Sequence, residues 1–260
     1  MKNTSQTAYF KNHAWQLYEN GYCAIPLEPQ TKRPVQSVDW MKYCWKQPDP
    51  NFITTQIERH PNMGVGLACG RQTVAIDIDA KDARNVAKIK DVAFEIFGET
   101  PLIRQGENPK IALLYRTSEP VISCRTPSID IIGLGAQLVA YGIHPKTKRE
   151  YRWIGQSTPT ELPCAALPSI TNVKIWNFYC LLAQEKFGVE HFEMCLAYDK
   201  INYTPPMSSI SVLFTLLFRS MLFGKENAAF QAQKILTGKY ASTGTGLNLE
   251  LKAGGRMIEL

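Results

Sequence analysis

The stretch TVAIDID at residues 73–79 constrains the fold and the chemistry of this chain more than any other. Its apolar residues are typical of a central strand, yet it ends in two carboxylates, Asp77 and Asp79. Residues two apart in a strand project from the same face, so these carboxylates lie side by side. At about 5 Å and an effective dielectric near 20 they repel by about 3 kcal/mol. A cation, a proton or several hydrogen-bond donors must offset that cost.

Two interpretations of this acidic pair are open. In the structural one, one aspartate caps the following helix and the other faces solvent. In the chemical one, both bind a divalent cation, which takes oxygen ligands and shares them with substrate phosphates. The chemical interpretation requires a third carboxylate and phosphate-binding cations nearby.

Candidates for both requirements occur further along the chain. Asp130, in SIDIIG, is flanked by apolar residues and is expected on a strand, where an unpaired carboxylate is costly. The alternative is an edge-strand residue that faces water. The candidate phosphate-binding residues are Lys32, Arg104, Lys110, Arg116 and His144. Each cation alone is better explained as a solvated surface residue than as a ligand, and the alternative for His144 is a turn residue before Pro145.

The hydrophobic pattern predicts a mixed sheet with helices packed on it, an α+β fold. A helix is expected at 7–20, with Ala8, Trp15 and Tyr18 at helical spacing, and another at 82–97, capped by Asp82 and ended by Gly98. The expected strands are 22–27, 64–70, 73–79, 111–116, 128–133 and 136–142.

The character of the sequence changes near residue 165. Helices are expected at 171–187, from 208 or 209 to 223, and at 225–236, whereas the last twenty residues have little periodicity. We therefore predict a catalytic domain over 1–165, a small helical appendage over 166–240, and a weakly ordered tail or truncated continuation over 241–260.

The composition of the chain indicates in which cellular compartment the protein works and which kinds of partner it can bind. The seven cysteines form no CxxC pair, and no signal peptide precedes them, so reduced thiols in a cytoplasmic setting are expected. The most apolar run, 210–223, is short for a membrane span and contains Arg219, so no membrane insertion is expected. A net charge of +6 is compatible with a polyanionic partner.

From Ala14 to Trp153 the chain resembles the N-terminal prim-pol domain of bifunctional DNA primase/polymerases, in the archaeo-eukaryotic primase superfamily. It is most similar to the versions carried by phages, prophages and plasmids, which would place the protein in the host cytoplasm. The resemblance rests on five blocks in order: GYCAIPLEPQTKRP with the later Trp40, NMGVGLACGRQTVAIDID, RQGENPKIALLYRT, SIDIIGLGAQLVAYGIHP and KREYRW.

The resemblance implies an RRM-like prim-pol catalytic core with flanking helices. It also implies that Asp77, Asp79 and Asp130 bind Mg²⁺ or Mn²⁺. The superfamily's second motif often supplies a His that contacts the nucleotide phosphates; here PKIALLYR has none, and Ala112 stands in its place. Lys110 is then the residue expected to take the phosphate role.

The implied activity is that of a nucleotidyltransferase, a DNA primase and DNA-directed polymerase of a mobile-element replication system. Its partners would be a single-stranded DNA template, nucleoside triphosphates and a replicative helicase. Lys32, Arg104, Lys110, Arg116 and His144 are the predicted nucleotide-binding residues. Two alternatives stay open: a metal-dependent nuclease that uses the same carboxylates, and a catalytically weak module that binds replication origins or single strands.

Overall fold

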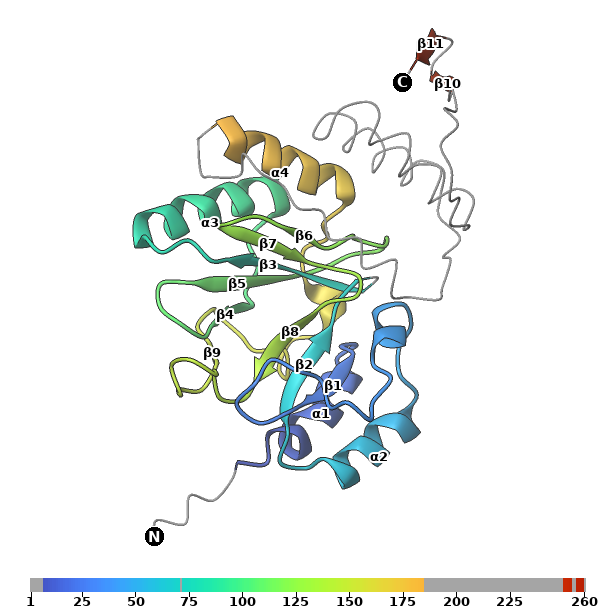
Figure 1. Ribbon diagram of the computed structural model, residues 1–260, viewed down its shortest axis with the longest axis vertical. Helices are drawn as coiled ribbons and strands as arrows, with labels where there is room; N and C mark the ends of the chain where they lie inside the picture. Colours follow the sequence, from blue (N-terminus) through green and yellow to red (C-terminus); the bar gives the residue numbers. More distant parts are fainter. Residues whose placement is uncertain (1–6, 71, 185–249, 254–255, 260) are drawn as a thin grey trace, which may run out of the picture. The chain divides into compact units, whose positions relative to one another are not determined.

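The computed structural model describes residues 7–70, 72–184, 250–253 and 256–259 (Figure 1). The chain divides into two compact units, Met1–Ile201 and Asn202–Leu260. The described part of the first unit contains two sheets and four α-helices, so the α+β class is confirmed. The strands that the sequence pattern assigned to one mixed sheet divide between these two sheets, and every pairing of named strands is antiparallel.

The larger sheet has six strands in the order β6-β7-β3-β5-β4-β9. Their bounds are β3 Thr73–Ile78, β4 Ile103–Gln105, β5 Ile111–Arg116, β6 Cys124–Arg125, β7 Ile129–Ile132 and β9 Arg152–Trp153. Central β3 is hydrogen-bonded to β5 on one side and to β7 on the other. The backbone of β3 is therefore paired on both sides, and its polar side chains lie on one of the two sheet faces, in the middle of the sheet.

The smaller sheet has three strands in the order β1-β2-β8, with bounds β1 Ala24–Leu27, β2 Gly64–Ala68 and β8 Gln137–Tyr141. Two helices pack beside it (Figure 1): α1 Tyr9–Glu19 and α2 Pro50–Arg59. Short 3₁₀ turns occur at Met41–Cys44 and Cys164–Ala166. Five described cysteines are buried outside any disulfide: Cys23, Cys44, Cys69, Cys124 and Cys164.

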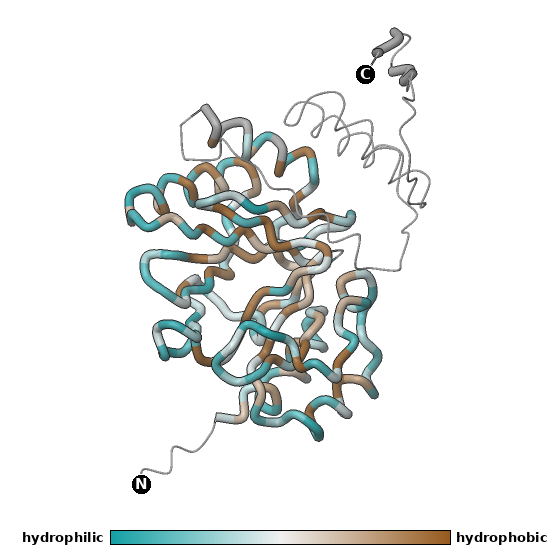
Figure 2. The backbone as a smooth tube through the Cα atoms, viewed as in Figure 1, coloured by the Kyte–Doolittle hydropathy of each residue, from teal (hydrophilic) through white to brown (hydrophobic). Residues whose placement is uncertain are grey.

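The two faces of the large sheet are packed differently. Val74, Ile76 and Ile78 alternate with Asp77 and project to the side covered by α3 Ala83–Phe97. There Phe97 contacts Tyr115 of β5, with ring centroids 5.5 Å apart. Beside α3 lies α4 Asn172–Gln184, whose Phe178 ring is 5.0 Å from the Phe97 ring, so both helices cover this side of the sheet (Figure 1). Figure 2 shows the apolar strands enclosed between these helices and the smaller sheet.

The opposite face is apolar at one end only. Ala75 of β3 and Leu114 of β5 join the core shared with the smaller sheet and α1, in which Leu67, Leu138 and Phe10 are buried. Two residues further along β3, Asp77 lies on the same face beyond this core. This face of the large sheet is therefore buried in the core at one end and forms a polar surface at the other.

Several local predictions are confirmed. Asp82 caps α3 by accepting hydrogen bonds from the backbone N–H groups of Arg84 and Asn85, and Gly98 follows its last residue with a positive φ of 88°. The predicted face of the first helix is wrong: α1 buries Phe10, Ala14 and Leu17, whereas Trp15 stays 41% exposed. The buried face of α1 is the one that packs against the smaller sheet, whereas Trp15 lies at the surface and donates a hydrogen bond to Glu19.

The predicted domain boundaries stay predictions. The helix expected at 171–187 begins as α4, whereas the helices expected at 208–223 and 225–236 lie outside the described residues. In the second unit, β10 Glu250–Ala253 pairs antiparallel with β11 Arg256–Glu259. Within the described ranges, none of the helices combines the length and the apolar character that crossing a bilayer requires.

Replacing Ile76 should test how far stability depends on the core beneath α3. Ile76 is fully buried, so Ile76→Ala should lower the free energy of unfolding by about 2–5 kcal/mol. The matched control is Ile154→Ala, because Ile154 is 47% exposed and its truncation should cost less than about 0.5 kcal/mol. Denaturant unfolding measures both values, and equal losses would contradict the assignment of the core.

Candidate active site

A single row of residues crosses the large sheet at the level of the acidic pair. Asp77 of β3 is opposite Asp130 of β7 on one side and opposite Ala112 of β5 on the other. Ala112 is in turn opposite Arg104 of β4. Directly paired residues project from the same face, so the register alone places two carboxylates and a guanidinium together on the polar end of that face.

Asp79 completes the acidic group just after the end of β3. Its backbone N–H donates to the carbonyl of Ser128 at 2.8 Å, which continues the pairing with β7 by one step. Its side chain is 44% exposed, compared with 16% for Asp77 and 29% for Asp130. The three carboxylates thus range from a nearly buried one to an open one.

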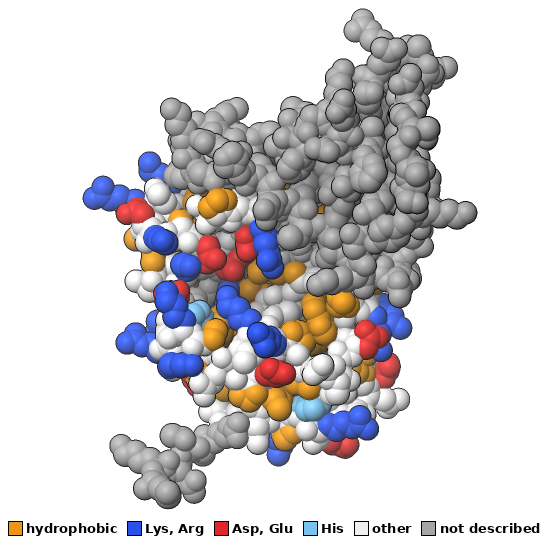
Figure 3. Space-filling model, viewed as in Figure 1, with side chains coloured by type: hydrophobic (Ala, Val, Ile, Leu, Met, Phe, Trp, Pro, Cys, Tyr) orange, Lys and Arg blue, Asp and Glu red, His pale blue; other side chains and the backbone are white. Residues whose placement is uncertain are grey.

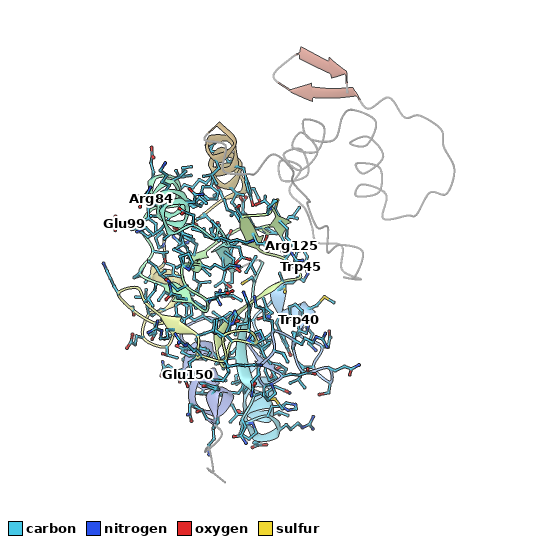
Figure 4. All side chains as sticks on the ribbon, turned by 60° about the vertical axis from the view of Figure 1, so that its left-hand side comes forward. Trp40, Trp45, Arg84, Glu99, Arg125 and Glu150 are labelled. Carbon is cyan, nitrogen blue, oxygen red and sulfur yellow. The ribbon has the colours of Figure 1, made fainter. Side chains whose placement is uncertain are left out.

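Each carboxylate has a cation of its own. Arg104 Nη2 lies 3.3 Å from Asp77 Oδ1, and Lys110 Nζ lies 3.3 Å from Asp79 Oδ1. Arg125, which projects from edge strand β6 (Figure 4), places Nε 3.9 Å from Asp130 Oδ2. The repulsion expected between Asp77 and Asp79 is therefore offset by two ion pairs, and the third pair compensates the charge of Asp130.

Four of these six charged groups line a small cavity of about 70 Å³, whereas Asp130 and Arg125 lie beside it on the same face and are not part of its wall. Its wall contains Asp77, Asp79, Arg104 and Lys110 from the sheet, and Lys32, Gly106, Glu107, His144 and Tyr151 from the surrounding turns. Figure 3 shows acidic side chains gathered in a hollow with Lys and Arg side chains along its border. A cavity of this size has room for ions and water, so a whole nucleotide would extend across its mouth.

The cavity wall is closely packed around Gly106. A Cβ atom at this position would lie 2.5 Å from Tyr151 Cε1 and 2.9 Å from His144 Cδ2, so a side chain would displace two residues of the wall. Tyr151 also supports Arg104, whose guanidinium carbon lies 4.8 Å from the centre of the ring. Glycine at position 106 lets the ring and the imidazole approach the sheet.

His144 is fixed by the turn that it begins. Its Nδ1 accepts hydrogen bonds from the backbone N–H groups of Lys146 at 3.3 Å and Thr147 at 3.1 Å. Burial lowers the pKa of His144, and the nearby charge of Lys32 lowers it further. The neutral imidazole then carries its proton on Nε2, so the same residue serves as the turn histidine that the sequence allowed and as a donor group in the wall.

Burial also sets the protonation of the carboxylates. It raises the pKa of Asp77 above its usual range, with a smaller contribution from Asp79, and Arg104 opposes the shift. Burial raises the pKa of Asp130 to about 6, Arg125 opposes the shift, and the charges of Asp77 and Asp79 add to it. The mutual effect of these three groups agrees with their common position on one face.

One predicted nucleotide-binding residue lies elsewhere. Arg116 is at the far end of β5, opposite Thr73, and is four residues from Ala112, a rise of about 13 Å. Its Nε donates to the carbonyl of Leu167 at 2.8 Å, which anchors the segment leading to α4. The structure does not bring Arg116 to the charged cavity, because four residues of an extended strand separate it from Ala112.

The sequence interpretation missed Arg125, Gly106 and Glu107. The signal for Arg125 was available, because the turn Thr126-Pro127-Ser128 places residue 125 opposite Asp130 across a short hairpin. Glu107 pairs with Lys146 at the rim of the cavity. No local pattern indicated that a Gly between Gln105 and Glu107 would allow two distant side chains to meet.

The structural interpretation of the acidic pair does not hold. The helix cap is Asp82, not Asp77 or Asp79, and Asp77 is largely buried. The chemistry of the donors suits a hard divalent cation, because all three side chains are carboxylates. Among the described residues no three such groups already converge on one point, since each carboxylate faces its own cation.

A larger cavity of about 500 Å³ lies on the other side of the same turns. Thr31, Ile143 and Glu150 line it, whereas their successors Lys32, His144 and Tyr151 line the charged cavity. The two cavities thus share these segments but have no lining residue in common. None of the three aspartates lines the larger cavity, whereas Asp77 and Asp79 line the smaller one, which is therefore the candidate site.

Fold and site together define an α+β domain whose main sheet presents carboxylates and cations on one face. Residues 14–168, more than half of the chain, match the family model of the bifunctional DNA primase/polymerase N-terminal domain. The chain belongs to this Prim-Pol family. Comparison with curated proteins gives no match.

Asp130 should make the stability of the fold depend on pH. Its pKa is about 6 in the folded chain and about 3.9 in an unfolded one, so between these values the folded state holds more protons. Raising the pH through this window therefore destabilises the fold. Asp130→Asn should melt at a higher temperature than the wild type near pH 7.5, and the difference should vanish near pH 4.

Thermal denaturation in the presence of a chelator measures this difference. The control is Asp91→Asn, which changes a carboxylate that is 71% exposed on α3. Its effect on the melting temperature should be small at both pH values. A constant gain for Asp130→Asn across the pH range would contradict the assigned burial effect.

Proposed function

We propose that the protein synthesises or extends primers on single-stranded DNA by metal-dependent nucleotidyl transfer. The observation that carries the proposal is the row Asp130, Asp77, Ala112 and Arg104 across one face of the sheet, with Asp79 beside it. This row sets carboxylates next to cations on one face of the sheet, where Asp77, Asp79 and Arg104 line the charged cavity, and phosphoryl transfer from a triphosphate requires this combination.

In this proposal Asp77, Asp79 and Asp130 hold Mg²⁺ or Mn²⁺. The bound ions would lower the pKa of the attacking 3′-hydroxyl and stabilise the charge on the attacking and leaving oxygens. Arg104 and Lys110 would bind the triphosphate, and Lys32 would reach it from the turn. His144, neutral and with its proton on Nε2, would donate one hydrogen bond rather than a full charge.

The template would follow a basic surface that adjoins the cavity. Two turns, 28–33 and 144–150, are tied by a hydrogen bond from Lys148 Nζ to Gln30 Oε1 at 3.4 Å. They carry Lys32, Arg33, Lys148 and Arg149, all exposed, and none of these four has a carboxylate at ion-pair distance within the described part of the chain. Phosphates of a single strand are the natural partners of such unpaired cations.

The mobile-element setting and cooperation with a replicative helicase belong to the same proposal. Their support is the similarity of the sequence blocks to the versions found in phages and plasmids. Two alternatives, a nuclease and a binding module without catalysis, would use the same charged cavity and basic turns. They differ in what they do to DNA, so the activity assay distinguishes them.

Removing any one carboxylate should abolish nucleotide incorporation. Asp77→Ala, Asp79→Ala and Asp130→Ala should each lose at least about a hundredfold in rate, because each removes a metal ligand. A priming assay on single-stranded templates, with ribo- and deoxynucleotides offered separately in Mg²⁺ or Mn²⁺, measures this.

Asp91→Ala, on the outer surface of α3, is the control and should retain full activity. Unchanged incorporation in all three site variants would exclude the proposed site. Strand cleavage in Mn²⁺ without any triphosphate would instead indicate the nuclease. Binding without incorporation, equal in wild type and Asp77→Ala, would indicate the binding module.

The basic turns should account for much of the salt dependence of DNA binding. Replacing Arg33, Lys148 and Arg149 by Ala removes three phosphate contacts. This should reduce the slope of log affinity against log salt by about 2 for a single strand. Fluorescence anisotropy of a labelled oligonucleotide over a range of salt concentrations gives the slope.

The matched control replaces Arg59, Arg84 and Lys88 by Ala, three exposed cations on α2 and α3. It changes the net charge equally and should leave the slope nearly constant. An equal reduction in both triple variants would show that net charge, not the two turns, determines binding.

A further inference from the structure

The acidic site is electrically balanced by the chain itself. Three carboxylates, Asp77, Asp79 and Asp130, face three cations, Arg104, Lys110 and Arg125, in one-to-one pairs. The formal charges of this group therefore sum to zero. Arg104 and Lys110 come from segments distant in sequence from their partners, whereas Arg125 reaches Asp130 across a short hairpin, so the balance depends on strand pairing and on the turns.

The three pairs differ in how tightly the fold holds them. The Arg104 side chain is 7% exposed, and its pair with Asp77 is the most buried of the three. Lys110 is 30% exposed and Arg125 66% exposed, so solvent screens their pairs increasingly. The Arg104–Asp77 pair consequently dominates the electrostatics of the cavity.

Ala112 makes this buried pair possible. It lies between Asp77 and Arg104 in the row, and its methyl group leaves the guanidinium free to extend over β5 to the carboxylate. Tyr151 supports the guanidinium from the other side. The Arg104 Nε is buried and has no hydrogen-bond partner among the described residues, so the guanidinium has donor capacity that the pair with Asp77 does not use.

A divalent ion that enters this balanced group alone meets a fixed guanidinium and an ammonium at the oxygens that it needs. A triphosphate that enters alone, with about four negative charges, meets three carboxylates. Two divalent ions and one triphosphate together add about +4 and −4, so the site stays neutral when both are present. The charge balance thus favours joint entry over either partial state.

We propose that Arg104, with Lys110 and Arg125, acts as an exchangeable counter-ion that makes metal and triphosphate binding mutually dependent. In the free protein these cations hold the carboxylates; when the nucleotide arrives they transfer to its phosphates, and the carboxylate oxygens are released to the metal. This inference rests on the proposed function for the identity of the nucleotide. It also accounts for three carboxylates that share a face without converging on one point.

The test measures Mn²⁺ binding to the full chain without nucleotide, by the electron paramagnetic resonance signal of free Mn²⁺. Arg104→Met removes the charge and keeps an unbranched side chain against Tyr151. It should bind Mn²⁺ alone about tenfold more tightly than the wild type. The same variant should bind a non-hydrolysable triphosphate analogue at least about tenfold more weakly, as measured by calorimetry in the presence of Mn²⁺.

Two further variants keep the test decisive if Arg104→Met is poorly folded. Arg104→Lys retains the charge and should leave Mn²⁺ affinity close to that of the wild type. Lys110→Met should tighten Mn²⁺ binding in the same direction but less, because its pair is more exposed. Arg59→Met, on the exposed surface of α2, is the matched control and should change neither affinity.

Equal or weaker Mn²⁺ binding by both Arg104→Met and Lys110→Met would overturn the inference, because the cations would then position the carboxylates rather than compete for them. This outcome is independent of the priming assay. If the wild type incorporates nucleotides but the variants bind Mn²⁺ with unchanged affinity, the counter-ion exchange is excluded and the proposed function stands. If the variants bind Mn²⁺ more tightly but the wild type incorporates no nucleotide, the proposed function is excluded and the competition between cations and metal stands.

Discussion

The buried ion pair between Asp77 and Arg104 is the interaction on which the site depends. A carboxylate in the middle of a six-stranded sheet is costly unless a partner compensates for the lost solvation, and Arg104 supplies that partner from two strands away. The pair forms because the intervening residue of β5 is an alanine. One small side chain thus allows a charged group on the central strand to be tolerated.

The architecture around this pair explains why the polar surface occupies only one end of the sheet face. Ala75 and Leu114 bury the near end against the smaller sheet and α1. Beyond them the smaller sheet no longer covers β3, and turns bring Lys32 and His144 over the edge of the cavity. The same face therefore contributes a core that stabilises the fold and, two residues further along β3, a charged cavity in which we propose that metal and nucleotide bind.

Local features of the sequence predicted part of the fold well. The strand at 73–78, the helix that follows it and its cap at Asp82 depend on contacts within a few residues, and all three are present. The helix α2 was missed although Asp49 and Pro50 form a recognisable beginning, with Asp49 accepting a hydrogen bond from the N–H of Phe52. The short strands β4, β6 and β9 had no such signal, because two or three residues do not establish a period.

The sequence alone determined that Asp77 and Asp79 share one face, because side chains alternate along any strand whatever its neighbours. It could not determine that Asp130 pairs with Asp77, that Arg104 lies on the far side of Ala112, or that Arg116 faces away towards Leu167. These facts depend on strand order and register, which are set by packing between segments distant in the chain. Tertiary structure therefore decided which charges meet, and with them the chemistry that the cavity can support.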